Sequence, residues 1–234
     1  MKDKIQLLNW DDIAHELNTR GYAAIPSLLS PEQCEALRAL YHKKTGYRKT
    51  VIMERHRFGL GEYKYFDYPL PPLIQALRTN IYKHLAPIAN LWMKALNTGI
   101  TYPATHTEFL EICKAHEQTK PTVLILKYGE GGFNTLHQDL YGEVYFPIQM
   151  VMFLSHYGHD YEGGEFVMTE QVPKAQSKAI VLKPKLGDVV LFATNFRPVK
   201  GKNGYYRANM RHGVSELTKG SRMTAGIIFH DALS

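Results

Sequence analysis

The stretch that follows Pro121 constrains the fold more than any other part of the sequence, because it is typical of a series of short β-strands. Its segments are rich in β-branched and aromatic residues, which favour pleated strands, and Gly-containing breaks separate most of them. Seven or eight antiparallel strands of this kind close most naturally into a jelly roll. We therefore predict an α+β protein with a cupin-like, double-stranded β-helix core. The predicted strands are residues 122–128, 145–154, 165–169, 179–182, 188–193, 205–214 and 223–229.

The first 120 residues have a different pattern, which predicts an N-terminal helical scaffold. Residues 10–19 and 73–96 have helical spacing of apolar residues, and Ser30-Pro31-Glu32-Gln33 combines a serine cap, a first-turn proline and a glutamine three residues after the cap. Residues 65–72, with three prolines, are expected to be an extended loop. At 234 residues the chain is most simply one domain, 1–234. We expect 1–120 to be mainly helical support with a substrate-facing loop, and 121–234 to be the catalytic core.

Two histidines and one aspartate have the spacing of a metal site. His137 and Asp139 are two residues apart, so on an extended chain they share one side, and His212 belongs to a late predicted strand. Two imidazoles and one carboxylate cover one face of an octahedron and leave three positions open, as a mononuclear Fe(II) centre requires. The competing triplet, residues 106–108, lies in a predicted helix, where residues i and i+2 diverge by about 200°. The sequence thus predicts that His137, Asp139 and His212 bind Fe(II).

An arginine near the predicted iron site indicates the cosubstrate. Arg222 follows His212 by ten residues, and a guanidinium matches a carboxylate through two parallel hydrogen bonds. A buried arginine there predicts 2-oxoglutarate, whose far carboxylate it would bind, with O2 as the second cosubstrate. Thr224, on the same strand face, and Tyr128, nine residues before His137, are predicted to add hydroxyl groups. A purely structural role in the core remains the alternative for Tyr128.

The net charge of +6 is concentrated in residues 41–66, which hold seven basic and two acidic residues together with six aromatic ones. Basic side chains interleaved with aromatic rings suit a surface that neutralises phosphates and stacks bases, so nucleic acid is a predicted partner. A solvated loop is the alternative. The predicted substrate contacts, some from this segment and some beside the metal motif, are Arg55, Arg57, Tyr63, Tyr65, Asn134 and Tyr141.

The remaining composition predicts a cytoplasmic protein without a membrane partner. Cys34 and Cys113 lie 79 residues apart and outside any Cys/His cluster, which indicates neither a disulfide framework nor a zinc site. The N-terminal residues lack the apolar core of a signal peptide. No run approaches the roughly 18 apolar residues of a membrane-spanning helix.

Several motifs resemble known oxygenase families. The pattern Tyr-x-x-Gly-x-x-Asn-x-x-His-x-Asp at 128–139, with Gly163–Phe166, Gly187–Phe192 and the pair His212 and Arg222, resembles prolyl-hydroxylase-like 2-oxoglutarate oxygenases. The Tyr-x-x-Gly-x-x-x-x-x-His-x-Asp part of this pattern also resembles the AlkB dealkylases. More specifically, residues 55–66, 137–143 and 226–231 resemble a bacterial family of oxygenases of damaged, methylated nucleic acid, along nearly the whole chain. The resemblance implies an Fe(II)- and 2-oxoglutarate-dependent dioxygenase that demethylates nucleic acid in DNA repair.

Two departures from AlkB leave other functions open. Leu126 stands where AlkB has the asparagine of its Asn-x-Tyr pair, and Ile228 occupies the position of a second arginine. The iron ligands alone do not distinguish demethylation from hydroxylation of a prolyl residue, another amino acid or a small molecule. A non-catalytic binding module with a retained metal fold is the third alternative, against which the intact set of ligands and Arg222 argues.

Overall fold

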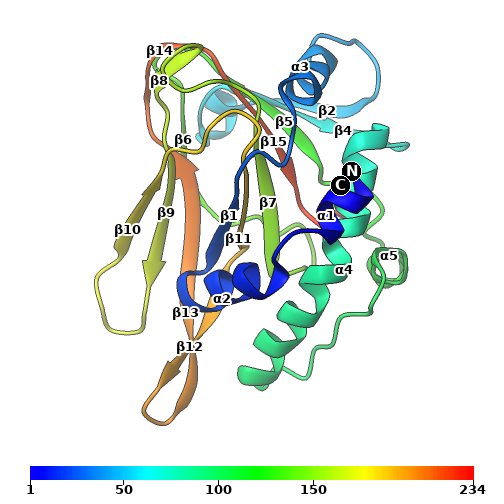
Figure 1. Cartoon of the computed structure of the whole chain (residues 1–234), viewed down its shortest axis with the longest axis vertical. Helices are drawn as coiled ribbons and strands as arrows, with labels where there is room; N and C mark the ends of the chain where they lie inside the picture. Colours follow the sequence, from blue (N-terminus) through cyan, green and yellow to red (C-terminus); the bar gives the residue numbers. More distant parts are fainter.

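The computed structural model describes all 234 residues and contains two large antiparallel sheets with helices packed against one of them (Figure 1). The seven-stranded sheet has the order β1 (Tyr22–Ile25), β11 (Val189–Ala193), β7 (Ile148–Phe153), β15 (Arg222–Ile227), β5 (Leu124–Tyr128), β4 (Glu62–Phe66) and β2 (Tyr47–Ile52). The second sheet has the order β10 (Lys178–Leu182), β9 (Phe166–Gln171), β13 (Gly204–Val214), β6 (Phe133–His137) and β3 (Gly59–Leu60), and β12 (Phe196–Gly201) pairs with β13. A small sheet joins β14 (Leu217–Gly220) to β8 (Tyr161–Gly163).

The helices come from the first half of the chain. In Figure 1 the long α4 and the shorter α1 and α5 lie on one side of the seven-stranded sheet, opposite the side that carries β9, β10 and β13. No helix combines the length and apolar character needed to cross a membrane. The helices are α1 (Lys2–Gln6), α2 (Trp10–Arg20), α3 (Pro31–Leu40), α4 (Pro72–Ala95) and α5 (His106–Ala115), with a 3-10 turn, η1 (Met53–His56).

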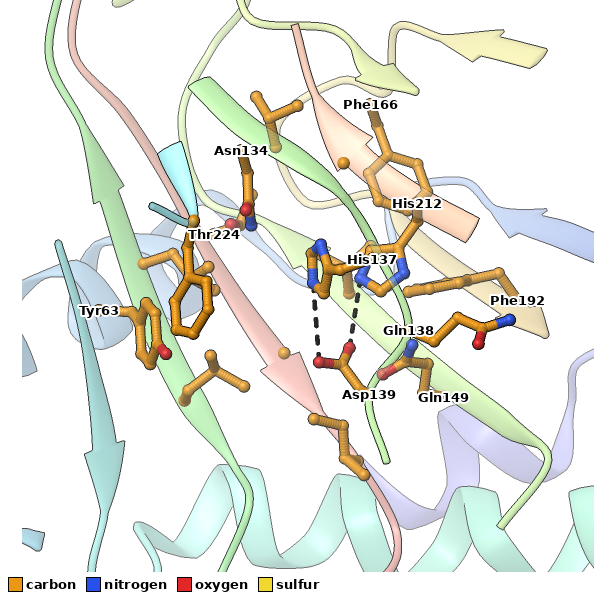
Figure 2. Close-up of a pocket in the computed structure, with 18 of the residues that line it drawn as sticks. Tyr63, Asn134, His137, Gln138, Asp139, Gln149, Phe166, Phe192, His212 and Thr224 are labelled. Atoms are coloured by element: carbon orange, nitrogen blue, oxygen red, sulfur yellow. Dashed lines mark ion pairs between the residues drawn. The ribbon is translucent and has the colours of Figure 1, made fainter. Parts of the chain in front are cut away.

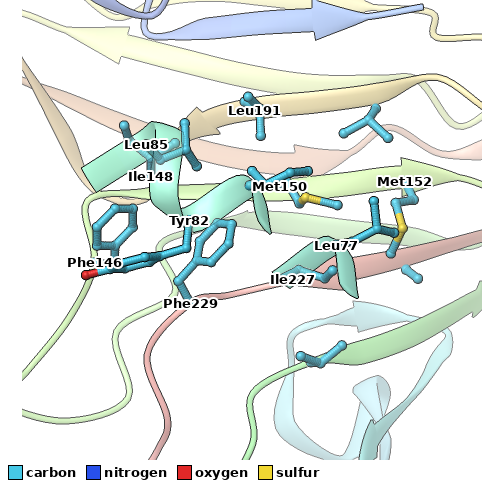
Figure 3. Packing of buried hydrophobic residues seen from close by; sticks show 14 of the residues in the cluster. Leu77, Tyr82, Leu85, Phe146, Ile148, Met150, Met152, Leu191, Ile227 and Phe229 are labelled. Carbon is cyan, nitrogen blue, oxygen red and sulfur yellow. The ribbon is translucent and has the colours of Figure 1, made fainter. Parts of the chain in front are cut away.

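The main core lies between α4 and the seven-stranded sheet. Figure 3 shows Leu77 and Leu85 of α4 packed over Ile148 and Met150 of β7. All six residues of β7 are buried, because helices cover one face of this strand and the second sheet covers the other. A strand buried on both faces is an almost continuous apolar run, as β7 is. The single polar residue of β7 is Gln149, which is also buried and faces away from the helices.

Most of the predicted elements are present. Each of the seven predicted strands overlaps an observed one, within a few residues at each end. The helix beginning at Pro31 has both bonds of a capping box: Ser30 Oγ accepts from the Gln33 N–H at 3.3 Å, and Gln33 Oε1 accepts from the Ser30 N–H at 3.0 Å. Pro87 lies inside α4, which continues through it as one helix.

The prediction for residues 41–66 was wrong in part, because β2, β3 and β4 replace the expected loop. The sequence did not predict β2 because most of its residues are polar. This strand is the last one of its sheet, and natural edge strands often carry lysines that prevent pairing with another chain. The extended loop predicted at 65–72 is also shorter than expected. Tyr65 and Phe66 complete β4, and Pro72 begins α4.

A buried ion pair ties α4 to the segment that follows β15. Arg78 is fully buried and contacts Asp231 at 2.8 Å (Nη2 to Oδ1), and its guanidinium donates to the backbone carbonyls of Ile228 at 3.1 Å and Phe229 at 3.1 Å. The same segment continues directly from the strand that carries Arg222. Arg78 therefore fixes the C-terminal end of β15 against the helical layer.

Replacing Arg78 with alanine should lower the free energy of unfolding by about 3–5 kcal/mol, because it leaves Asp231 as a buried, uncompensated charge. Urea denaturation measures the loss. Lys114→Ala is the control, because the Lys114–Glu111 pair is 3.8 Å long and both side chains are 68% exposed; it should cost less than about 1 kcal/mol. Equal losses in the two variants would contradict the anchoring role.

Candidate active site

The structure brings His137, Asp139 and His212 together between the two large sheets. His137 ends β6 and is paired directly with His212 on the neighbouring strand β13, while Asp139 follows two residues after β6 ends. One ligand atom of each residue lies within 4.8 Å of the other two. As Figure 2 shows, the Asp139 carboxylate faces both rings, with Oδ2 3.2 Å from His212 Nε2 and Oδ1 3.7 Å from His137 Nε2.

The surroundings prepare these groups to bind a cation. His137 Nδ1 lies 2.7 Å from the Thr135 carbonyl oxygen, so this nitrogen carries the proton and the lone pair of Nε2 is free. Burial lowers the pKa of His212, which keeps its ring neutral. Burial alone would raise the pKa of Asp139, but attraction to His137 and hydrogen bonds from His212 and Tyr141 outweigh it and hold this pKa below its ordinary value. The result is a carboxylate that faces two imidazole rings.

A cavity of about 230 Å³ extends from these three residues to Arg222. Its lining is mostly hydrophobic and includes Phe166 and Phe192, whose rings lie 6.0 Å and 4.8 Å from that of His212. Leu126 and Ile228, the two positions that depart from the AlkB pattern, also line it. The cavity is therefore a largely apolar space with a few polar groups.

Arg222 is the only arginine or lysine among the residues that line this cavity. It is 1% exposed, yet its Nε and Nη1 have no hydrogen-bond partner. Its guanidinium carbon lies 5.4–5.9 Å from the ring centres of Phe153, Tyr128 and Tyr161. Burying an unpaired charge in such surroundings is unfavourable unless an anion completes the site. A guanidinium has edges with two parallel N–H groups, which match the two oxygens of a carboxylate.

Two hydroxyl groups lie beside Arg222. Tyr128 and Thr224 are both buried and line the cavity, and Tyr128 is paired with Arg222 across β5 and β15. Burial raises the pKa of Tyr128 to about 12, so its hydroxyl stays protonated, and it accepts a hydrogen bond from Asn134 Nδ2 at 3.3 Å. The three residues predicted for the cosubstrate thus all line the same cavity as the candidate metal ligands.

The predicted substrate contacts divide into two groups. Tyr63, Tyr65, Asn134 and Tyr141 line the cavity, but Arg55 and Arg57 do not. Both arginines are exposed on η1 and the residue that follows it, where their side chains extend into solvent. The structure therefore does not place these two arginines at the cavity, and a contact between them and a substrate stays a prediction.

Comparison with known proteins identifies the family. A family model described as "Oxygenase, catalysing oxidative methylation of damaged DNA", named Oxygenase-NA, matches residues 61–232. The chain belongs to this family. Two proteins from two strains of Mycobacterium tuberculosis, both described only as uncharacterised, are 42% identical to it over 167 residues, which is 71% of this chain and 72% of theirs.

Solved structures of 2-oxoglutarate oxygenases share the fold. A Pseudomonas putida prolyl-4-hydroxylase aligns with a TM-score of 0.53 at 14% identity and covers 95% of this chain and 98% of its own. A Trichoplax adhaerens prolyl hydroxylase, solved with a peptide fragment of the hypoxia inducible factor, aligns with a TM-score of 0.55 at 14% identity. The alignment covers 98% of this chain and 91% of the hydroxylase. A Burkholderia pseudomallei oxidoreductase of the 2OG-Fe(II) oxygenase family aligns with a TM-score of 0.53 at 15% identity. The alignment covers 97% of this chain and 94% of the oxidoreductase. The chain thus belongs to an oxygenase family and shares its fold with a 2OG-Fe(II) oxygenase and with prolyl hydroxylases, which confirms the predicted relationship to oxygenases.

One polar residue of the oxygenase cavity was missed in the sequence. Gln149 is 2% exposed, and its Nε2 has no hydrogen-bond partner although the side chain lines the cavity (Figure 2). The signal was present, because an amide in the middle of the apolar run 148–153 has to face something polar. Phe166 and Phe192 gave no such signal, since aromatic residues on strands are ordinarily part of a core.

Arg222→Met should stabilise the oxygenase when it is free of metal and small ligands, because it removes a buried charge whose donors lack partners. The expected gain in free energy of unfolding is about 1–3 kcal/mol, the usual cost of an unsatisfied buried donor. The measurement is urea denaturation with a metal chelator present.

Arg197→Met is the matched control for this prediction. Arg197 is also a buried arginine, but it contacts Glu170 at 2.6 Å. Its replacement should destabilise the protein by about 3–5 kcal/mol, because Glu170 loses its partner. If Arg222→Met destabilises the protein as much as Arg197→Met does, Arg222 has a structural partner, and its role in binding a carboxylate is contradicted.

Proposed function

We propose that this oxygenase binds Fe(II) through His137, Asp139 and His212, binds 2-oxoglutarate through Arg222, and uses O2 to demethylate damaged nucleic acid. The observation that carries the cofactor assignment is a single cavity that is lined both by the three candidate ligands and by a buried arginine whose Nε and Nη1 have no hydrogen-bond partner. In this proposal the two large sheets form a double-stranded β-helix that encloses the site. A cytoplasmic location remains a prediction from the sequence.

The protein's own residues have defined tasks in this scheme. The Nε2 atoms of both histidines and one oxygen of Asp139 would hold the metal and leave three positions open. The guanidinium of Arg222 would donate to the far carboxylate of 2-oxoglutarate, and the hydroxyl of Thr224, two residues later on β15, would add a donor. When bound, Fe(II), 2-oxoglutarate and O2 supply the oxidising chemistry: 2-oxoglutarate loses CO2 to become succinate, and one oxygen atom is inserted into a substrate C–H bond.

The family description and oxygenase chemistry together favour removal of a methyl group. The description names damaged DNA and "oxidative methylation". An oxygenase inserts oxygen and transfers no methyl group, so the reaction consistent with this chemistry oxidises a methyl group that is already present. Oxidation of an N-methyl group gives an N-hydroxymethyl group, which releases formaldehyde and restores the base. DNA repair is the role that this reaction implies.

A basic groove next to the cavity supports a nucleic-acid substrate. It has a volume of about 430 Å³, and none of its lining residues is acidic. The Arg48 guanidinium lies 4.5 Å above the ring of Tyr65, which lines the active-site cavity, so groove and cavity share one boundary. A nucleic-acid strand whose phosphates lie in the groove could place an unpaired base in the cavity. The groove is lined by His42, Lys43, Lys44, Tyr47, Arg48, Lys49, Thr50 and Lys64.

The cavity offers aromatic surface to such a base. Tyr63 and Tyr65 line it with ring centres 5.3 Å apart in an edge-to-face arrangement. Flipped bases are commonly held by aromatic stacking and by hydrogen bonds to their edges. The buried amide of Gln149 is a group without a partner that could make such a hydrogen bond.

Hydroxylation of a peptide is the second candidate function. The observation in its favour is a set of exposed apolar side chains near the cavity, on β3, β6 and the residue before β3. These are Phe58 (46% exposed), Leu60 (37%) and Phe133 (37%). Such residues would suit an apolar peptide segment better than a negatively charged nucleic-acid strand.

Alanine at His137, Asp139 or His212 should weaken Fe(II) binding strongly and abolish substrate-coupled turnover of 2-oxoglutarate, because a three-residue site has no spare ligand. Anaerobic calorimetry measures binding, and succinate release measures turnover. His159→Ala is the control: His159 is an exposed histidine outside the cavity and should leave both unchanged. A folded His212→Ala variant that retains iron and activity would refute the assignment.

Glutamine at Lys43, Lys44 and Lys49 should weaken binding of methylated single-stranded oligonucleotides and flatten its salt dependence. Each lost phosphate contact lowers the slope of log K against log salt by about 0.7, so three lost contacts lower it by about 2. Lys174, Lys178 and Lys202 are exposed lysines outside the groove, and their triple glutamine variant removes the same charge elsewhere. Fluorescence anisotropy gives the slope, and a formaldehyde assay gives turnover.

This experiment also separates the two candidate functions. Equal slopes in the two triple variants would mean that the groove does not hold the phosphates. A protein that binds no oligonucleotide at low salt, yet hydroxylates a peptide, would favour the hydroxylase alternative.

A further inference from the structure

Two tyrosines form a hydrogen-bonded chain that ends on the carboxylate of Asp139. The Tyr141 hydroxyl donates to Asp139 Oδ1 at 2.8 Å and accepts from the Tyr65 hydroxyl at 3.1 Å. Both tyrosines line the cavity, and their rings meet edge to face with centres 6.2 Å apart. Tyrosine hydroxyls are protonated near neutral pH, so both can act as donors.

The position of Asp139 explains why its carboxylate needs such support. Asp139 lies beyond the end of β6, in residues 138–147, which form neither helix nor strand. The strand ladder that fixes His137 and His212 therefore does not fix the aspartate. Its side chain has two equivalent oxygens, and a metal site that leaves three positions open needs only one of them.

We propose that Tyr141 is a positioning residue that holds Asp139 Oδ1 and leaves Oδ2, the oxygen that faces His212, for the metal. Tyr65 positions Tyr141 from the cavity wall. This inference rests on the proposed metal site and deepens it, because it states which carboxylate oxygen is the ligand and what selects it. Hydrogen bonds to metal ligands from surrounding residues typically change metal affinity 10–100-fold when they are removed.

The contacts of Tyr65 place it where it can hold Tyr141. Its side chain is 6% exposed overall, lies under the Arg48 guanidinium at 4.5 Å, and packs edge to face with Tyr63. Arg48 is itself held by a hydrogen bond from its Nε to the Pro121 carbonyl at 2.8 Å. The chain from Arg48 through Tyr65 to Tyr141 therefore has a fixed outer end, which is a requirement for orienting Asp139.

Co(II) binding tests the proposal without reference to catalysis. The full-length protein is titrated with Co(II) under chelator-free conditions, and both the dissociation constant and the visible absorption spectrum of the bound ion are recorded. Tyr141→Phe should bind Co(II) about 10–100-fold more weakly and give a changed spectrum. Tyr65→Phe should act in the same direction with a smaller effect. The double variant should be no worse than Tyr141→Phe alone, because the two hydroxyls act in series.

Tyr102→Phe is the matched control. Tyr102 is buried, and its hydroxyl donates to the Tyr145 carbonyl at 3.0 Å, away from the cavity lining. Its loss should leave the Co(II) affinity and spectrum unchanged, which separates a general effect of losing a buried tyrosine hydroxyl from an effect on Asp139. Thermal unfolding of each variant confirms that it is folded.

The outcomes distinguish this proposal from the one on which it rests. If the unmodified protein binds Co(II), His212→Ala abolishes binding, and Tyr141→Phe keeps the original affinity and spectrum, the positioning role is overturned while the metal site stands. If the unmodified protein binds no Co(II), both proposals fail. Additive losses in the double variant would overturn the serial arrangement of the two tyrosines.

Discussion

The pairing of β6 with β13 is the interaction on which the rest of the site depends. It places His137 directly opposite His212, although 75 residues separate them in sequence. A slip of one residue would turn His212 to the opposite face of the sheet. The other edge of β13 prevents such a slip, because six consecutive residues, Asn209–Val214, pair in register with β9. The position of the candidate metal ligand His212 is thus determined by a ladder of backbone hydrogen bonds in which none of the other candidate ligands takes part.

The strand β7 separates the requirements of stability from those of the site. Its alternating side chains give Ile148, Met150 and Met152 to the core against α4, while Gln149 and Val151 face the second sheet. Burying large apolar side chains stabilises a fold by about 1.5–3 kcal/mol each. This contribution offsets unfavourable features on the cavity side, such as the unpaired N–H groups of Arg222 and the unpaired amide of Gln149. Both features can persist because the helical layer does not depend on them.

The sequence predicted the strands of the second half, the three candidate metal ligands and Arg222, because each of these rests on local periodicity or on a spacing of two residues. It did not predict β2 and β4, whose charged residues conceal their extended backbone. Nor did it show that Arg55 and Arg57 lie outside the cavity, on η1 and the residue after it, because their position depends on the tertiary fold. The Tyr65–Tyr141 chain was beyond prediction as well. It joins a strand to an irregular segment 76 residues away, and such a contact exists only after the tertiary fold has formed.

The choice between nucleic acid and peptide substrates depends on what the basic groove is for. The lysines of β2 have a simpler role available, because charged residues on the last strand of a sheet prevent pairing with another chain. That role needs side chains that extend into solvent, as Lys49 does. Arg48 does not fit it, because its guanidinium turns inward, packs over Tyr65 and donates to the Pro121 carbonyl. A cation at the boundary between groove and cavity has no use in protecting an edge. Besides holding Tyr65, Arg48 would, in the function proposed above, contact a phosphate whose attached base enters the cavity, and its position supports the proposal of a nucleic-acid substrate.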